Sequence, residues 1–183
     1  MATLSTTAWV LHDLGLAADF GGNLFGQIAM EPAVKTIHSK RERGEVTHAA
    51  WNRYKYVNGV ALAAMAGSWI IGRTMLSGNE VSRHARRLTI VKDVLVGGAL
   101  LTGTATIVIG RLLDRASNGA PAIETGSEPA PETPPTVARL QKMVNAFGNA
   151  KILFEAGIVA ATAILAMKSG RSPRWSVWSR FLP

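Results

Sequence analysis

Apolar residues gather in four long segments of this chain, with polar connections between them. The segments run from Ala8 to Met30, Tyr56 to Leu76, Leu88 to Leu113 and Val144 to Met167. Each is long enough as a helix to cross a hydrocarbon core, which takes about 20 residues. A soluble four-helix bundle would instead carry polar residues along one face of each helix. The pattern therefore predicts an all-α fold, a four-helix transmembrane bundle.

This bundle is expected to be a single integral membrane domain over residues 1–183, a multi-pass protein of the cell membrane. Pro32 is predicted to close the first span, because proline lacks a backbone donor and restricts the residue before it. Three aromatic residues near the second span are expected in the interfacial belt of the membrane, namely Trp51, Tyr54 and Tyr56.

Two further polar segments have distinct compositions. Residues 116–136 hold five of the 8 prolines, together with Ala and Glu, and this composition predicts a flexible linker. The C-terminal tail from Ser169 to Pro183 mixes Trp175 and Trp178 with arginines. Such a tail is expected to lie along the membrane interface without crossing it.

The charge and the residue types exclude several classes of function. The net charge is +8, but the basic residues flank apolar spans, so anionic lipid headgroups explain them better than nucleic acid does. The chain has 0 cysteines, which excludes disulfides, thiolate zinc sites and cysteine nucleophiles. No hydrolase or nucleotide-binding motif is present, so we expect a protein that is not an enzyme.

Small residues recur at helical spacing within the spans. Members of this pattern are Gly22 and Gly26 in the first span, Gly59 and Gly67 in the second, and Gly98 in the third. In lipid, small residues let two helix backbones approach closely. These glycines are therefore predicted to pack helices together, either within one chain or between subunits.

Ionisable residues lie deep inside two of the spans. Asp19 and Glu155 fall near the middle of the first and fourth spans, while Asn23 and Lys151 lie one turn from them towards the same face. If the two helices touch, these four side chains form one polar intramembrane cluster. Such a cluster can be a proton or ion relay, or an ion pair that locks the bundle. Lys92 lies nearer a membrane face and is expected to reach the interface.

Histidines offer a weaker lead. His12, Asp13 and His84 belong to the same membrane face and have side chains that suit zinc or copper, but no spacing fixes them as a site. Only His12 lies within a span, whereas a membrane haem takes histidines from two facing helices. Haem and metal are thus possible but unsupported cofactors.

The first span also resembles a known family. His12 is followed after seven residues by Phe20-Gly21-Gly22, and the span ends near Pro32. This pattern resembles the His…Trp-x-Gly-Gly…Pro signature of copper-resistance D-like proteins and related uncharacterised four-helix bacterial membrane proteins. Phe20 replaces the tryptophan, and the spacer before the glycines is missing. The resemblance implies a small helical membrane domain linked to metal transport, with the metal role resting on His12.

These observations predict a non-enzymatic accessory or assembly subunit of a membrane complex. Its expected partners are the lipid bilayer and other membrane subunits or further copies of the chain. The alternatives are a proton, ion or small-molecule transporter that uses the intramembrane cluster, and a protein that handles a metal or cofactor. Lys and Arg are spread so evenly over the connections that the orientation in the membrane stays open.

Overall fold

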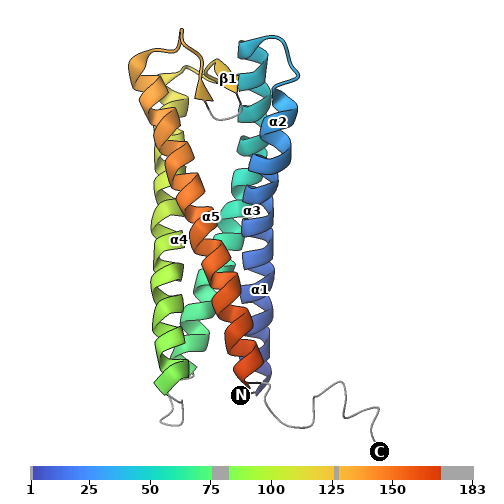
Figure 1. The fold of residues 1–183 in the computed structure, drawn as a ribbon, viewed down its shortest axis with the longest axis vertical. Coiled ribbons are helices and arrows are strands. Elements are labelled where there is room, and N and C mark those ends of the chain that lie inside the picture. The colour runs from blue at the N-terminus through green and yellow to red at the C-terminus, as the bar shows by residue number, and fades with distance from the viewer. Residues whose placement is uncertain (1, 76–82, 126–127, 170–183) are drawn as a thin grey trace, which may run out of the picture.

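The computed structural model of the protein describes residues 2–75, 83–125 and 128–169. Four long helices make up most of this part, and a small β-hairpin lies between the last two (Figure 1). The elements are α1 (Ala2–Phe25), the π-helical turn η1 (Gly26–Met30), α2 (Glu31–Val34), α3 (Lys40–Met75), α4 (Arg83–Ala116), β1 (Ile123–Thr125), β2 (Glu128–Pro129) and α5 (Pro135–Ser169). The all-α prediction is confirmed.

The long helices run along a common axis and alternate in direction (Figure 1). α1 packs against α3, α4 packs against α5, and contacts between α1 and α5 join the two pairs. The hairpin and α2 lie at one end of the bundle, and the N-terminus lies at the other (Figure 1). Two helical segments, Arg87–Ala116 and Pro135–Met167, are long and apolar enough to cross a membrane.

The first helical segment does not stop at Pro32, contrary to the prediction. η1 and α2 continue α1 without a break as far as Val34. Pro32 lies in the first turn of α2, directly after a π-helical turn that already interrupts the regular ladder of α-helical hydrogen bonds, so a residue without a backbone N–H is tolerated there. The widened π-turn precedes it, and there the Glu31 N–H donates to the Gly26 carbonyl. Such π-turns are rare and often mark functional positions.

α3 begins at Lys40, well before the second predicted span. Trp51 and Tyr54 are therefore part of this helix: the Trp51 ring lies against Gly26 of η1, and the Tyr54 hydroxyl lies against Gly22 of α1. Of the three aromatic residues assigned to the interfacial belt, Tyr56 is exposed as expected. The other two occupy space that the glycines of α1 leave free.

The segment 116–136 was predicted to be a flexible linker, and its described part is folded instead. β1 and β2 pair as an antiparallel hairpin. Ile123 and Ala130 are both buried, so the hairpin has an apolar side that covers the end of the bundle. Although the segment is rich in Pro and Glu, its two buried apolar residues help to anchor it.

Charged groups fasten the hairpin to the start of α3. Lys40 Nζ lies 2.6 Å from Glu124 Oε2 and 3.6 Å from Glu132 Oε2. The hydrogen bond to the Glu124 carboxylate raises the pKa of the Lys40 ammonium. Arg43 donates to the Ile37 carbonyl at 2.6 Å and also to the Glu124 carbonyl.

The predicted packing glycines divide into two groups. Gly22, Gly26 and Gly98 lie against Tyr54, Trp51 and Phe154, respectively, and serve packing within the chain. Gly59 and Gly67 have open space where a Cβ would stand. These two residues of α3 are therefore not used for packing in the described part of the bundle.

A matched pair of glycine substitutions tests this packing. A Cβ on Gly15 would lie 2.6 Å from the Ala61 carbonyl oxygen and 2.8 Å from the Met65 nitrogen, both backbone atoms of α3. Gly15→Ala should therefore lower the free energy of unfolding by about 1–3 kcal/mol, the usual cost of overpacking. Thermal or denaturant unfolding in a mild detergent, followed by circular dichroism, measures it.

Gly67→Ala is the control, since nothing lies within 4 Å of its added Cβ. Alanine favours a helix over glycine by about 1 kcal/mol, so this variant should be as stable as the parent or slightly more stable. Equal losses in the two variants would contradict the close contact between α1 and α3.

Candidate functional site

Polar side chains form two buried layers across the bundle. We call the first the central cluster, and it consists of Asp19, Asn23, Tyr54, Asn58, Lys151 and Glu155. We call the second the Lys92 cluster, and it consists of Trp9, His12, Trp69, Lys92 and Thr162. An apolar layer separates the two along every helix, with the buried residues Leu16, Met65, Ala99 and Ile158.

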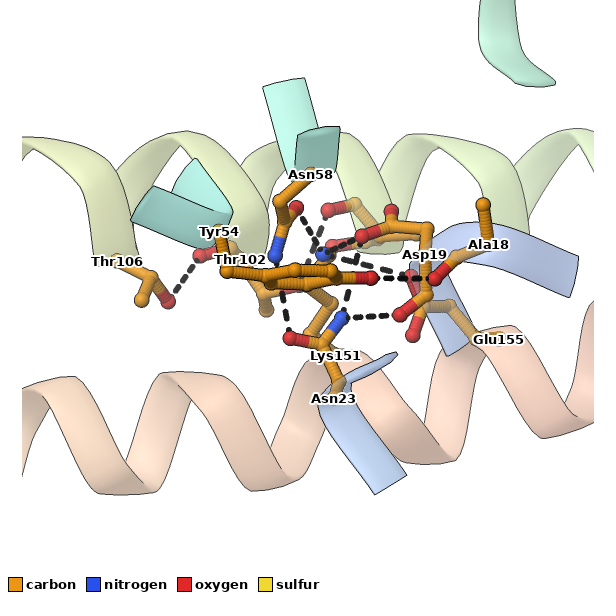
Figure 2. A network of polar contacts seen from close by, with 11 residues as sticks. Ala18, Asp19, Asn23, Tyr54, Asn58, Thr102, Thr106, Lys151 and Glu155 are labelled. Atoms are coloured by element: carbon orange, nitrogen blue, oxygen red, sulfur yellow. Dashed lines mark hydrogen bonds and ion pairs between the residues drawn. The ribbon is translucent and has the colours of Figure 1, made fainter. Parts of the chain in front are cut away.

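Lys151 is the centre of the central cluster (Figure 2). Its Nζ lies 2.5 Å from Asp19 Oδ1 and 3.4 Å from Glu155 Oε1. The same Nζ donates to Asn58 Oδ1 at 2.9 Å. The side chains of Asp19 and Glu155 are 0% exposed and that of Lys151 is 3% exposed. The four-residue spacing of Lys151 and Glu155 puts both on the face of α5 that meets α1.

Amide groups complete the network between α1 and α3 (Figure 2). Asn23 donates to the Asp19 carbonyl at 2.7 Å and to Asp19 Oδ1 at 3.1 Å. Asn58 donates in turn to Asn23 Oδ1 at 3.1 Å. The Tyr54 hydroxyl donates to the Ala18 carbonyl at 2.5 Å. These bonds fix the Asp19 carboxylate on the side that faces Lys151.

α4 provides space for the central cluster and no charge. A Cβ built on Gly103 would lie 3.3 Å from Lys151 Cε, so the absence of a side chain there admits the lysine stem. The hydroxyls of Thr102 and Thr106 donate back to carbonyls of α4, at 2.7 Å and 2.8 Å. The charges of this cluster therefore come from α1 and α5 alone.

Lys92 is fully buried, which corrects the expectation that it reaches the membrane interface. Its Nζ donates to Thr162 Oγ1 at 2.6 Å. The same atom lies 4.2 Å from the centroid of the Trp69 ring and 4.9 Å from that of Trp9. Within the described residues no carboxylate forms an ion pair with it. Aromatic faces attract a desolvated cation, and this explains why the side chain turns inward.

His12 lies against both tryptophans of the Lys92 cluster. The Met65 carbonyl lies 2.8 Å from His12 Nδ1, and because a carbonyl only accepts, Nδ1 carries the proton. Nε2 is buried and has no hydrogen-bond partner in the described part of the chain. A cavity of about 10 Å³, large enough for one water, is lined by His12 and Ala8, Trp9, Ser68, Trp69 and Gly72.

The predicted metal ligands do not come together in the described structure. His12 is buried, whereas the next residue, Asp13, is exposed, so their side chains leave α1 in different directions. The side chain of His84 lies outside the described residues. Within those residues, no three His, Asp or Glu side chains could hold a metal ion.

The structure does bring Asp19, Asn23, Lys151 and Glu155 together, at the contact between α1 and α5. The sequence analysis missed the partners on α3, Tyr54 and Asn58. Asn58 is the polar amide in an otherwise apolar or small stretch, and this signal could have identified it. The two tryptophans around Lys92 gave no such signal, because they lie far apart in the sequence and meet only in the fold.

Comparison with known proteins adds no relative. No protein-family model matches the chain, and no similar protein was found among curated proteins or solved structures. The resemblance of the first span to copper-resistance D-like proteins stays a prediction. The class of protein must therefore be argued from the geometry.

The two buried lysines should respond in opposite ways to replacement by methionine. Lys151→Met leaves the buried Asp19 carboxylate without its cation, and breaking such a pair costs about 3–5 kcal/mol. Lys92→Met leaves only aromatic rings and a hydroxyl, and methionine packs well against aromatic rings. The lost cation–π contacts are worth about 2 kcal/mol, less than the several kcal/mol that it costs to desolvate an ammonium.

We therefore expect Lys151→Met to lower the free energy of unfolding and Lys92→Met to leave it unchanged or raise it. Unfolding of both variants in the same detergent gives the comparison, and each variant is the control for the other. Similar losses in both variants would contradict the difference between the two clusters.

Proposed function

We propose that this protein is a four-span integral membrane protein that acts, without catalysis, as an accessory or assembly subunit of a membrane complex. The observation that carries the proposal is an inverted distribution of side chains. Large apolar residues are exposed on all four long helices, among them Leu14, Val60, Leu101 and Leu153. Meanwhile, four charged side chains are buried in the interior, namely Asp19, Lys92, Lys151 and Glu155. In water such a surface is unfavourable, whereas in lipid it is the expected arrangement.

Helices α1 and α3 are not among the two segments that are long and apolar enough to cross a membrane, but their side chains support the same proposal. Their polar residues within the bundle, such as Asp19 and Asn58, belong to the central cluster and do not lie on the outer surface. Large apolar residues such as Leu14 and Val60 are exposed on their outer surface. Polar groups that face the interior lower the average hydropathy of a span without exposing charge to lipid.

An assembly role is supported by the glycines that the bundle leaves unused. Gly59 and Gly67 lie two turns apart on α3 with open space above them. Small residues of this kind let a second membrane helix approach closely. The cavity beside the Lys92 cluster, about 10 Å³ in volume, has room for a water and none for a larger solute.

Single cysteines can test the four-span topology, because the native chain has 0. Cysteines at Thr36 and Thr136 should react with a membrane-impermeant maleimide from one side of sealed vesicles only. A cysteine at Ala2 should react from the other side. Leu101→Cys should react only after unfolding, although Leu101 is 75% exposed, because lipid covers it. Rapid labelling of Leu101→Cys in intact vesicles would contradict the topology.

The assembly role predicts that the protein extracted from native membranes in a mild detergent carries partners or further copies. Native mass spectrometry should show a mass above that of the single 19.5 kDa chain. The double variant Gly59→Leu/Gly67→Leu should lose this association and keep the stability of the single chain. Val60→Leu, a small change at another exposed position of α3, is the control. A lone monomer from the unmodified protein would count against the proposal.

A second candidate function, a proton relay, is favoured by one specific observation. Both Glu155 oxygens and Asp19 Oδ2 are buried without a hydrogen-bond partner in the described structure. Buried carboxylates of this kind are typical of intramembrane proton paths. Proton flux into proteoliposomes that is lost in Asp19→Asn and Glu155→Gln would favour the relay over a purely structural cluster.

A further inference from the structure

We propose that the central cluster binds one proton, which is carried by Glu155 and shared with Asp19, so that the cluster is neutral as a whole. This inference concerns the ligand of the cluster and does not depend on the assembly role. The cluster would need this proton both as a proton relay and as an ion pair that only locks the bundle. The argument rests on charge, burial and the positions of the carboxyl oxygens.

The charges of the cluster do not balance without a proton. Lys151 provides one positive charge, and ionised Asp19 and Glu155 would provide two negative charges. All three side chains are at most 3% exposed, so water cannot compensate the excess. A buried charge without a partner costs several kcal/mol, and a group in that position takes up or releases a proton instead.

The hydrogen bonds show which carboxylate is the better partner for Lys151. Asp19 Oδ1 accepts from Lys151 at 2.5 Å and from Asn23 at 3.1 Å. Glu155 has only the longer 3.4 Å approach to Lys151, and neither of its oxygens accepts a hydrogen bond in the described structure. Asp19 is therefore the ionised member, and Glu155 is the member that holds the proton.

The proton has an acceptor within reach. Asp19 Oδ2 is buried and has no hydrogen-bond partner in the described structure, and the carboxyl groups of Asp19 and Glu155 meet at Lys151 Nζ, at 2.5 Å and 3.4 Å from it (Figure 2). Two ionised carboxylates cannot bond to one another, because both only accept. A single proton on Glu155 makes that bond possible and gives partners to two otherwise unsatisfied groups.

Among the described residues, no charged side chain other than Lys151 forms an ion pair with Asp19 or Glu155. α1 supplies Asp19, α5 supplies Lys151, and α3 supplies Tyr54, whose hydroxyl is bonded to Ala18. α4 contributes the neutral Thr102 and the space at Gly103. The other buried lysine, Lys92, binds Thr162, which lies seven residues or about 10 Å beyond Glu155 along α5.

A larger ligand is less suitable than a proton. Within the described residues, no group of three His, Asp or Glu side chains could hold a metal ion. A metal ion would need space for several oxygen ligands. A proton needs no cavity, and it adds the single positive charge that the cluster lacks.

Infrared spectroscopy of the protein in lipid bilayers at neutral pH tests the proposal directly. The carbonyl stretch of a protonated carboxylic acid should be present in the unmodified protein and should shift in D₂O. Glu155→Gln should abolish this band, because the proton carrier is gone. Asp19→Asn should abolish it as well, because Glu155 then ionises to neutralise Lys151.

Glu45→Gln is the control, since Glu45 is exposed and paired with Arg41, and it should keep the band. Helical circular dichroism of each variant shows that the fold is retained, and both substitutions preserve the size of the side chain. Absence of the band in the unmodified protein overturns the proposal. Retention of the full band in either Glu155→Gln or Asp19→Asn also overturns it, since charge balance requires loss in both.

Discussion

An ammonium group buried in an apolar bundle must have partners, and this constraint on Lys151 organises the structure. The side chain starts on α5, pairs with Asp19 of α1 and bonds to Asn58 of α3. Its stem passes Gly103 of α4. One side chain therefore contacts all four long helices, and a shift of any helix along its axis would break a contact. Apolar packing alone would tolerate such shifts far better, because dispersion contacts are individually weak.

The two buried lysines show two physical solutions to the same problem. Lys151 is compensated by charge, and Lys92 by the faces of two tryptophans and one hydroxyl. Compensation by charge is strong but brings an excess carboxylate with it, and this excess is the origin of the bound proton. The apolar layer between the clusters keeps the two sites separate. A proton could cross that layer only if water entered or side chains moved.

The sequence allowed the helical class and the central cluster to be predicted, because both depend on spacing along single helices. Long apolar segments indicate helices, and the matching depths of Asp19 and Glu155 indicated that the first and last of them meet. What could not be predicted depends on contacts between distant segments. The burial of Lys92 requires Trp9 and Trp69 to meet around it, and the folding of the hairpin requires Ile123 to find the end of the bundle. The prediction that the first helical segment ends at Pro32 was also wrong, because the effect of a proline depends on its position within the helix.

A double-mutant cycle on Asp19→Asn and Lys151→Met, measured as the free energy of unfolding in lipid-like detergent, tests the central claim most directly. If the contact between these two residues organises the bundle, the effects are strongly non-additive, with a coupling energy of about 1–3 kcal/mol. The double variant should then be more stable than the sum of the two single losses implies. In that variant Glu155 is the only carboxyl group left in the cluster, and it is neutral when protonated. Additive effects would show that the two side chains do not interact, and would contradict the account.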